Sequence, residues 1–223
     1  MGAELSTKLD TQNSDNVNLT GGTVDGIAIG QTTPAAASVT SLLSQAGASS
    51  GAPTVRGNGN ISLQIVAAGN GNGADTTDDV LMTYALPANA LDQPGRQVTI
   101  TAAGKFATNS HNKEVKCFWG ATSPTVGSAI SGGTNIADSG VVTTSNGGWW
   151  LQAIVQKYGA NGSNTQLAQG QVIAGSTHTG TNVPVALTNT ESAAINIAIT
   201  GASGTSGAAN DVLCQMLEIT FSD

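Results

Sequence analysis

Acidic and histidine side chains are the residues that could carry acid–base or nucleophilic chemistry, and they are sparse in this chain. Paired carboxylates could hydrolyse a glycosidic bond, and the second half supplies six candidates: Asp92, Glu114, Asp138, Glu191, Asp211 and Glu218. No two of them form a distinctive local pair. His111 and His178 lack a nearby nucleophile motif that would suggest a Ser-His-Asp group. The sequence therefore predicts a protein that is not an enzyme.

Few residues in the sequence suit metal binding or redox chemistry. Cys117 and Cys214 lie in apolar surroundings, VKCFW and VLCQM, which favours two small buried thiols, with a disulfide as the alternative. Two cysteines and two distant histidines match no zinc pattern. Asp75, Asp78 and Asp79 fit no calcium-loop spacing. We therefore expect no metal and no other cofactor.

Sugar binding is a more specific possibility than catalysis or metal binding. Trp149 and Trp150 follow a glycine pair, and an exposed indole can pack against a pyranose ring, while asparagine-containing loops at Asn109, Asn161 and Asn164 could bind hydroxyl groups. Successive side chains of a strand point to opposite faces, so only one of the two tryptophans can enter the core. The other could contact a glycan, or it could pack against another subunit, where tryptophan is enriched.

Composition and charge limit the classes of partner that this chain can have. The chain has 223 residues, of which 9% are charged, with a formal net charge of −7 and 29 glycines. Nucleic-acid binding needs clustered basic residues, and the seven lysines and arginines form no patch. No run approaches the roughly 20 apolar residues of a membrane span. The terminus MGAELSTKLD lacks a secretory signal pattern. We expect no nucleic-acid partner and no membrane insertion.

All eight aromatic residues fall between Tyr84 and Phe221, so the second half can build a core and the first half cannot. Strand-like segments separated by turn residues follow one another in this half, without a helical period. They are 80–86, 96–108, 114–120, 135–144, 148–159, 165–175, 184–189, 193–201 and 210–222. The pattern predicts an all-β protein whose head is a jelly-roll-like β-sandwich, with an immunoglobulin-like sandwich as the alternative.

Alternation within these segments predicts which side chains face the core. In 148–159, Trp149 and its alternate neighbours should lie opposite Trp150. In the last segment, we expect Leu213, Leu217, Ile219 and Phe221 to share the core face.

Three regions follow from this reading: an extended segment over 1–60, a Gly/Asn-rich linker over 61–79, and the sandwich over 80–223. The first region offers only one or two apolar residues per short piece, among them Val24, Ile27, Ile29, Val39 and Leu42. A lone ribbon of this kind buries too little surface to offset its ordering entropy. Three copies wound about one axis could bury these residues against each other, so we expect an intertwined homotrimeric β segment.

A resemblance supports this arrangement. The run LTGGTVDGIAIGQTTPAAASVTSL resembles a short module that recurs in structural proteins of tailed bacteriophages, especially tail-fibre and head-spike or head-fibre chains. The match covers roughly residues 13 to 43. It implies a homotrimer that is assembled in the host bacterial cytoplasm, is held on the virion by its N-terminal region, and carries an outward-facing sandwich.

The resulting expectation is a virion structural protein, a short trimeric fibre or spike that could adhere to the host. A capsid decoration or cement protein that stabilises the head is the first alternative. A secreted or surface carbohydrate-binding module is the second. The expected partners are identical chains, other capsid or tail proteins, and a host-surface glycan.

Overall fold

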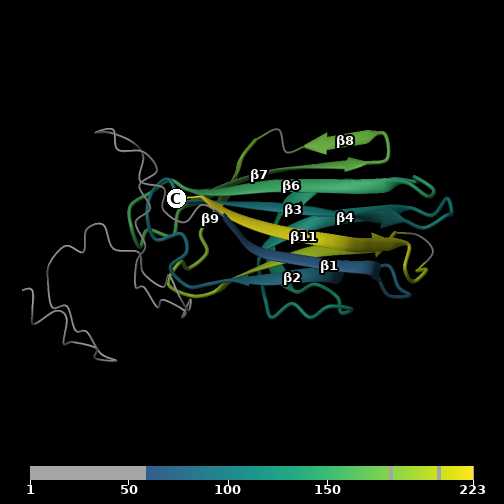
Figure 1. Cartoon of the computed structure of the whole chain (residues 1–223), viewed down its shortest axis with the longest axis horizontal. Coiled ribbons are helices and arrows are strands. Elements are labelled where there is room, and N and C mark those ends of the chain that lie inside the picture. The colour runs from purple at the N-terminus through teal and green to yellow at the C-terminus, as the bar shows by residue number, and fades with distance from the viewer. Residues whose placement is uncertain (1–58, 181–182, 205–206, 223) are drawn as a thin grey trace, which may run out of the picture. The chain divides into compact units, whose positions relative to one another are not determined.

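The computed structural model describes residues 59–180, 183–204 and 207–222, and every regular element among them is a β-strand (Figure 1). The strands are β1 (Gly59–Gly71), β2 (Asp79–Leu86), β3 (Gln97–Phe106), β4 (Lys113–Ala121), β5 (Gly132–Asp138), β6 (Gly148–Lys157), β7 (Gln166–Ala174), β8 (Thr177–Gly180), β9 (Val185–Leu187), β10 (Ile195–Ser203) and β11 (Val212–Ser222). No helix with the length and apolar character needed to cross a membrane occurs in the described residues.

The strands form two antiparallel sheets that enclose one core. The large sheet has the order β1-β11-β3-β6-β7-β8, with β9 also paired to β7, and the small sheet has the order β2-β10-β4-β5. Figure 1 shows the large sheet from β8 at the top to β1 below. The core between the sheets includes the fully buried side chains of Phe106, Trp119, Leu151 and Ile197. The predicted all-β sandwich is therefore confirmed at the level of two packed antiparallel sheets.

Period-two patterning positions the core side chains, as the sequence predicts. In β6, Trp149, Leu151, Ala153 and Val155 are buried, whereas Trp150 is only partly buried on the opposite face. The alternate isoleucines of β10 are likewise buried. Alternation places one set of side chains inside and leaves the other on the outer face of each sheet.

The segment predicted to be a linker needs correction, because most of it is a strand. Residues 61–71 belong to β1, which pairs with β11, and only 72–78 connects β1 to β2. Val66 packs against the core, and the Nδ2 of Asn70 donates a hydrogen bond to the carbonyl of Leu81 at 3.0 Å. Pairing with β11 satisfies part of the backbone of this Gly/Asn-rich segment. The sandwich therefore begins at β1, earlier than residue 80.

A second correction concerns Leu213, which was expected on the core face of the last strand. The register of β11 against β3 shifts between Cys214 and Met216. Cys214 is buried before the shift, and Leu217 and Ile219 are buried after it, while Leu213 is only partly buried. A β-bulge inserts one residue and reverses the alternation beyond it. The expected face is therefore confirmed for Leu217 and Ile219 and wrong for Leu213.

The two cysteines are both buried and unpaired, which settles the alternative left open by the sequence. Burial strongly raises the pKa of the Cys117 thiol and raises that of Cys214 to about 12. Thiols that stay protonated react slowly with alkylating reagents. Both residues therefore act as small core side chains.

The ladder between the first and last strands defines two ends of the sandwich. Gly59 of β1 is the partner of Phe221 of β11, so β1 begins where β11 finishes. We call this the entry end; it also carries loops 87–96, 158–165 and 188–194. The opposite end, which we call the tip, carries loops 72–78, 107–112 and 139–147.

Candidate functional site

The two tryptophans predicted to bind a glycan or a subunit lie on opposite faces of the large sheet. Trp149 is 3% exposed, and its Nε1 donates a hydrogen bond to the carbonyl of Leu213 at 3.2 Å. Trp150 lies on the outer face, with Ala103 of β3 and Ile173 of β7 as its cross-strand partners. Of the pair, only Trp150 is placed to contact a ligand or another chain.

Asn109 lies at the tip, within a polar cluster around Asp211. The Asp211 carboxylate accepts hydrogen bonds from Asn109 Nδ2 at 2.6 Å and from Ser203 Oγ at 2.8 Å, and it lies 2.8 Å from His111 Nδ1. Burial raises the pKa of Asp211, but these hydrogen bonds outweigh it and hold the pKa below its usual value. Because Ser203 donates to the carboxylate rather than to the imidazole, the three residues do not form a serine-protease-like relay.

Lys113 joins this cluster to a neighbouring loop of the tip. Its side chain is fully buried, and Nζ donates to the carbonyls of Asn109 at 2.9 Å, His111 at 3.0 Å and Thr144 at 3.3 Å. Burial lowers the pKa of Lys113, and the nearby Asp211 charge opposes that shift. Loops 107–112 and 139–147 are therefore held together by a buried ammonium group, which is a structural role.

Asn161 and Asn164 lie at the entry end, in the loop after β6. Asn161 is exposed, while Asn164 Oδ1 accepts the backbone N–H of Glu191 at 3.0 Å. Glu191 in turn forms a buried ion pair with Lys157, at 2.7 Å from Nζ to Oε1, and accepts a hydrogen bond from Gln166 Nε2 at 2.6 Å. The structure thus spreads the five predicted contact residues over the tip, the core, the outer face and the entry end.

Acidic side chains gather on the outer side of the small sheet, but a lysine lies among them. Lys116 Nζ lies 2.9 Å from Asp78 Oδ2 and 2.8 Å from Glu114 Oε2. Burial, together with the neighbouring Asp138, raises the pKa of Glu114 against the opposing effect of Lys116. No group of three or more acidic, histidine or cysteine side chains suited to a metal ion occurs in the described part of the chain.

The outer face of the large sheet carries a continuous row of apolar side chains. Its members are successive cross-strand partners, one from each of β1, β11, β3, β6 and β7: Ile65, Met216, Ala103, Trp150 and Ile173. We call this the apolar row. Ile65 is 68% exposed and Ile173 is 40% exposed. Large apolar side chains arranged contiguously on a surface mark a contact site more often than scattered ones do.

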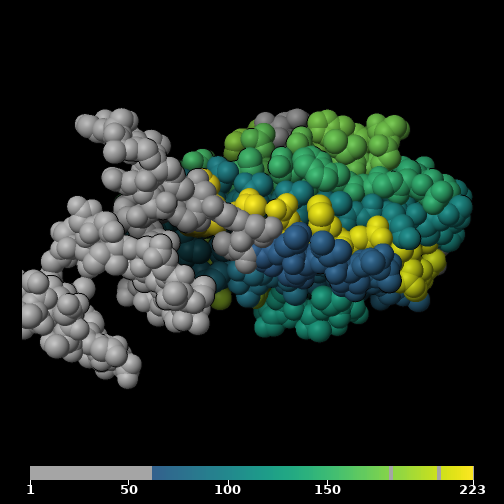
Figure 2. Space-filling model, in the orientation of Figure 1, coloured from purple at the N-terminus to yellow at the C-terminus, as the bar shows by residue number. Residues whose placement is uncertain are grey.

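This face is also poor in charge. The residues beside the apolar row that point outward from β3, β6 and β7 are mostly threonine and glutamine: Thr99, Thr101, Gln152, Gln156, Gln169 and Gln171. Among the outward residues of β1, β11, β3, β6 and β7, the acidic and basic side chains are Glu218 and Lys105. Figure 2 shows the face, with β1 (blue) along one border and β6 to β8 (green) along the other.

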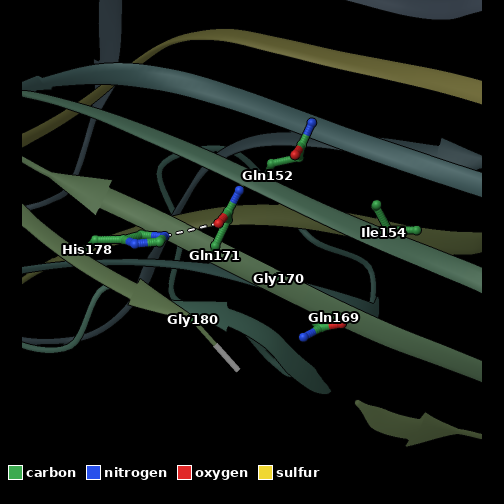
Figure 3. A pocket seen from close by; sticks show the side chains of 7 residues that line it. All are labelled: Gln152, Ile154, Gln169, Gly170, Gln171, His178 and Gly180. Carbon is green, nitrogen blue, oxygen red and sulfur yellow. Dashed lines mark hydrogen bonds between the residues drawn. The ribbon is translucent and has the colours of Figure 1, made fainter. Parts of the chain in front are cut away.

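A hollow of about 230 Å³ lies on this face, over β6, β7 and β8. Figure 3 shows the side chains that line it: Gln152, Ile154, Gln169, Gly170, Gln171, His178 and Gly180. The only interaction drawn there joins His178 Nε2 to Gln171 Oε1 at 3.0 Å. A second hollow, of about 300 Å³, shares Ile154 and Gln169 with the first. Apolar side chains and uncharged amides dominate the lining of both.

The residues predicted for the trimer segment, Val24, Ile27, Ile29, Val39 and Leu42, lie outside the described residues. Comparison of the chain with protein-family models, curated proteins and solved structures finds no match.

Proposed function

We propose that the protein is a structural component of a tailed-bacteriophage virion. It forms a homotrimeric short fibre or spike, with the region 1–60 attached to the particle and the sandwich facing outward. The sequence module at 13–43 supports the virion assignment. The observation that carries the self-association is the exposed apolar row on the charge-poor face of the large sheet.

The size of this face suits a stable contact between proteins. β6 has 10 residues, so the face is about 33 Å long, and five neighbouring strands are about 24 Å wide. The resulting footprint of about 800 Å² is close to the area that one partner contributes to an ordinary specific interface, and in a trimer two neighbours share it. Because chains with a net charge of −7 repel each other, identical copies are expected to meet where charges are scarce.

The strand order supports the finer assignment of a jelly roll. The chain passes from the large sheet (β1) to the small (β2), back to the large (β3), and then to the small (β4 and β5). It returns to the large sheet for β6 to β9, and it ends with β10 in the small sheet and β11 in the large one. Repeated crossing between two sheets is the winding of a double-sheet jelly roll.

The pairing of Gly59 with Phe221 supports the orientation on the particle. The N-terminal region leads into β1 at the entry end, so attachment through that region would leave the tip as the outermost part. The tip loops would then be the first to meet a host surface.

The test is to locate the protein on intact particles. An epitope tag would be inserted after Ser222, at the end of β11. The particles would be labelled with a gold-conjugated antibody against the tag and imaged by electron microscopy. We expect labelled sites on the tail or head of the particle. A few sites per particle would indicate a fibre or spike, and tens to hundreds a capsid decoration. Tagged protein that stays in the lysate, with unlabelled particles, would overturn the proposal.

A further inference from the structure

We propose that neighbouring copies meet through two different patches of the large sheet: the β1 edge of one copy docks over the hollow between β6 and β8 of the next. This inference rests on the proposed homotrimer, and it specifies how that homotrimer closes.

The exposed large side chains of the outer face fall into two groups. The first is on β1, where Leu63 is 53% exposed and Ile65 is 68% exposed. The second is on β6 and β7, where Ile154, Leu167 and Ile173 are 37–40% exposed. β11 and β3 lie between the two groups, and four strand spacings separate β1 from β7 by about 19 Å. The groups are thus distinct patches of one surface.

The two patches differ in shape in a complementary way. The side chains on β1 project most, because β1 is at the border of the large sheet and is paired with β11 on one side. The side chains on β6 and β7 are less exposed; Ile154 lines both hollows, and Leu167 lines the second. A projecting aliphatic pair can fill a recess with an apolar floor at Ile154, which increases buried area without rearranging either strand.

Their chemistry is also compatible. β1 contains no acidic or basic residue in its sequence GNISLQIVAAGNG, and the hollow is lined mainly by glutamine amides around Ile154. The Gln152 amide could accept or donate hydrogen bonds to the open edge of β1. Neither β1 nor the lining of the hollow therefore brings an aspartate, glutamate, lysine or arginine side chain into the contact.

Two different patches per chain are what a ring requires. A contact between unlike patches repeats around an axis and closes when the rotation allows it, whereas a contact of one patch with itself gives a dimer. The separation of the β1 patch from the β6–β8 patch is thus compatible with a closed trimer and distinguishes this contact from a twofold pair.

Cysteine cross-linking of the full-length chain tests the contact. Ile65→Cys and Ile154→Cys, the latter in the floor of the hollow, would be made singly and together, and treated with a short bismaleimide. The native thiols are buried with raised pKa values, so they should contribute little background. We expect the double variant to give covalent dimers and trimers, and each single variant to give none above wild type. Ile65→Cys combined with Val141→Cys is the matched control, because Val141 is 63% exposed and lies outside the large sheet.

The outcomes separate the two proposals. Efficient linking by Ile65→Cys alone would show that β1 of one copy contacts β1 of another. A trimer that is not cross-linked in the double variant would show that other surfaces are in contact. Either result overturns the proposed contact but not the trimer. A monomeric full-length chain overturns both. Binding of maltohexaose to the assembled trimer, lost in Gln152→Ala, would show that the hollow is an open saccharide site and would also overturn the contact.

Discussion

The ammonium group of Lys157 lies 2.7 Å from a carboxylate oxygen of Glu191, and both side chains are buried, at 0% and 3% exposure. Lys157 is the last residue of β6, and Glu191 belongs to the loop between β9 and β10. The pair is completed by Gln166 and Ser163, which bond to Glu191 and Lys157 respectively. It therefore fastens loops 158–165 and 188–194 together at the entry end.

Removing one partner of this pair should be costly. Glu191→Ala leaves a buried, uncompensated ammonium group, and we expect the free energy of unfolding to fall by about 3–5 kcal/mol. The double variant Lys157→Met, Glu191→Leu removes both charges and should recover most of that loss. Denaturant unfolding at one fixed protein concentration measures both variants. Equal losses in the single and double variants would contradict the view that the unpaired charge causes the effect.

Ile219→Asp tests the core face of β11. Ile219 is fully buried, and a carboxylate there would have no partner. We expect the variant to lose soluble, folded protein. Thr220→Asp, the neighbouring residue on the outer face, is the matched control and should keep the sandwich fold by circular dichroism. A folded Ile219→Asp variant would show that the burial assignment is wrong.

The hydrogen bonds to Asp211 should make the free energy of unfolding depend on pH. Burial raises its pKa, but hydrogen bonds from Asn109, Ser203 and His111 lower it further, so the folded pKa lies below that of the unfolded chain. The stabilisation is therefore present above the unfolded pKa of about 3.9, and it is lost as the pH falls through the folded pKa. We expect Asp211→Asn to cost about 2 kcal/mol near neutral pH.

The measurement for Asp211 is the difference in unfolding free energy between wild type and Asp211→Asn from pH 7 to pH 3. This difference should shrink as the pH falls below about 4. Asn112→Ala, in the same loop, is a control that should show no such pH trend. A difference that stays constant down to pH 3 would contradict the role given to the Asp211 charge.

A substitution at Ile65, the exposed end of the apolar row, should weaken association of the chains without weakening their folding. Ile65→Lys places a charge on an exposed position of β1, so the isolated sandwich should tolerate it. In the assembly it would lose about 1.5–3 kcal/mol of apolar burial at each contact. Light scattering should show a shift from trimer towards monomer. Val141→Lys, at a position of similar exposure, should leave the trimer intact; equal behaviour of the two variants would exclude a special role for β1.

Most strands from β2 onward could be predicted because they combine local alternation with flanking turn residues, but β8 (Thr177–Gly180) falls between the predicted segments 165–175 and 184–189. β6 is the clearest case, since Trp149 and Trp150 separate to opposite faces as the period of two requires. β1 could not be predicted this way. It lacks aromatic residues and contains glycine, asparagine and alanine, and its order depends on pairing with β11, about 150 residues later in the chain.

The candidate surface was harder to predict than the fold. The apolar row joins residues from Ile65 to Met216, and neither alternation nor local spacing determines which strands become neighbours. The partner of Asp211 at His111 is 100 positions away for the same reason. The β11 bulge likewise shifts Leu213 off the expected face through a register change that no local signal in the sequence indicated.

Sedimentation equilibrium of the full-length chain at micromolar concentration tests the central claim, that the chain assembles into a homotrimer. The account predicts a single species with the mass of three 22.1 kDa chains. A folded species with the mass of one chain, unchanged as concentration increases, would contradict it.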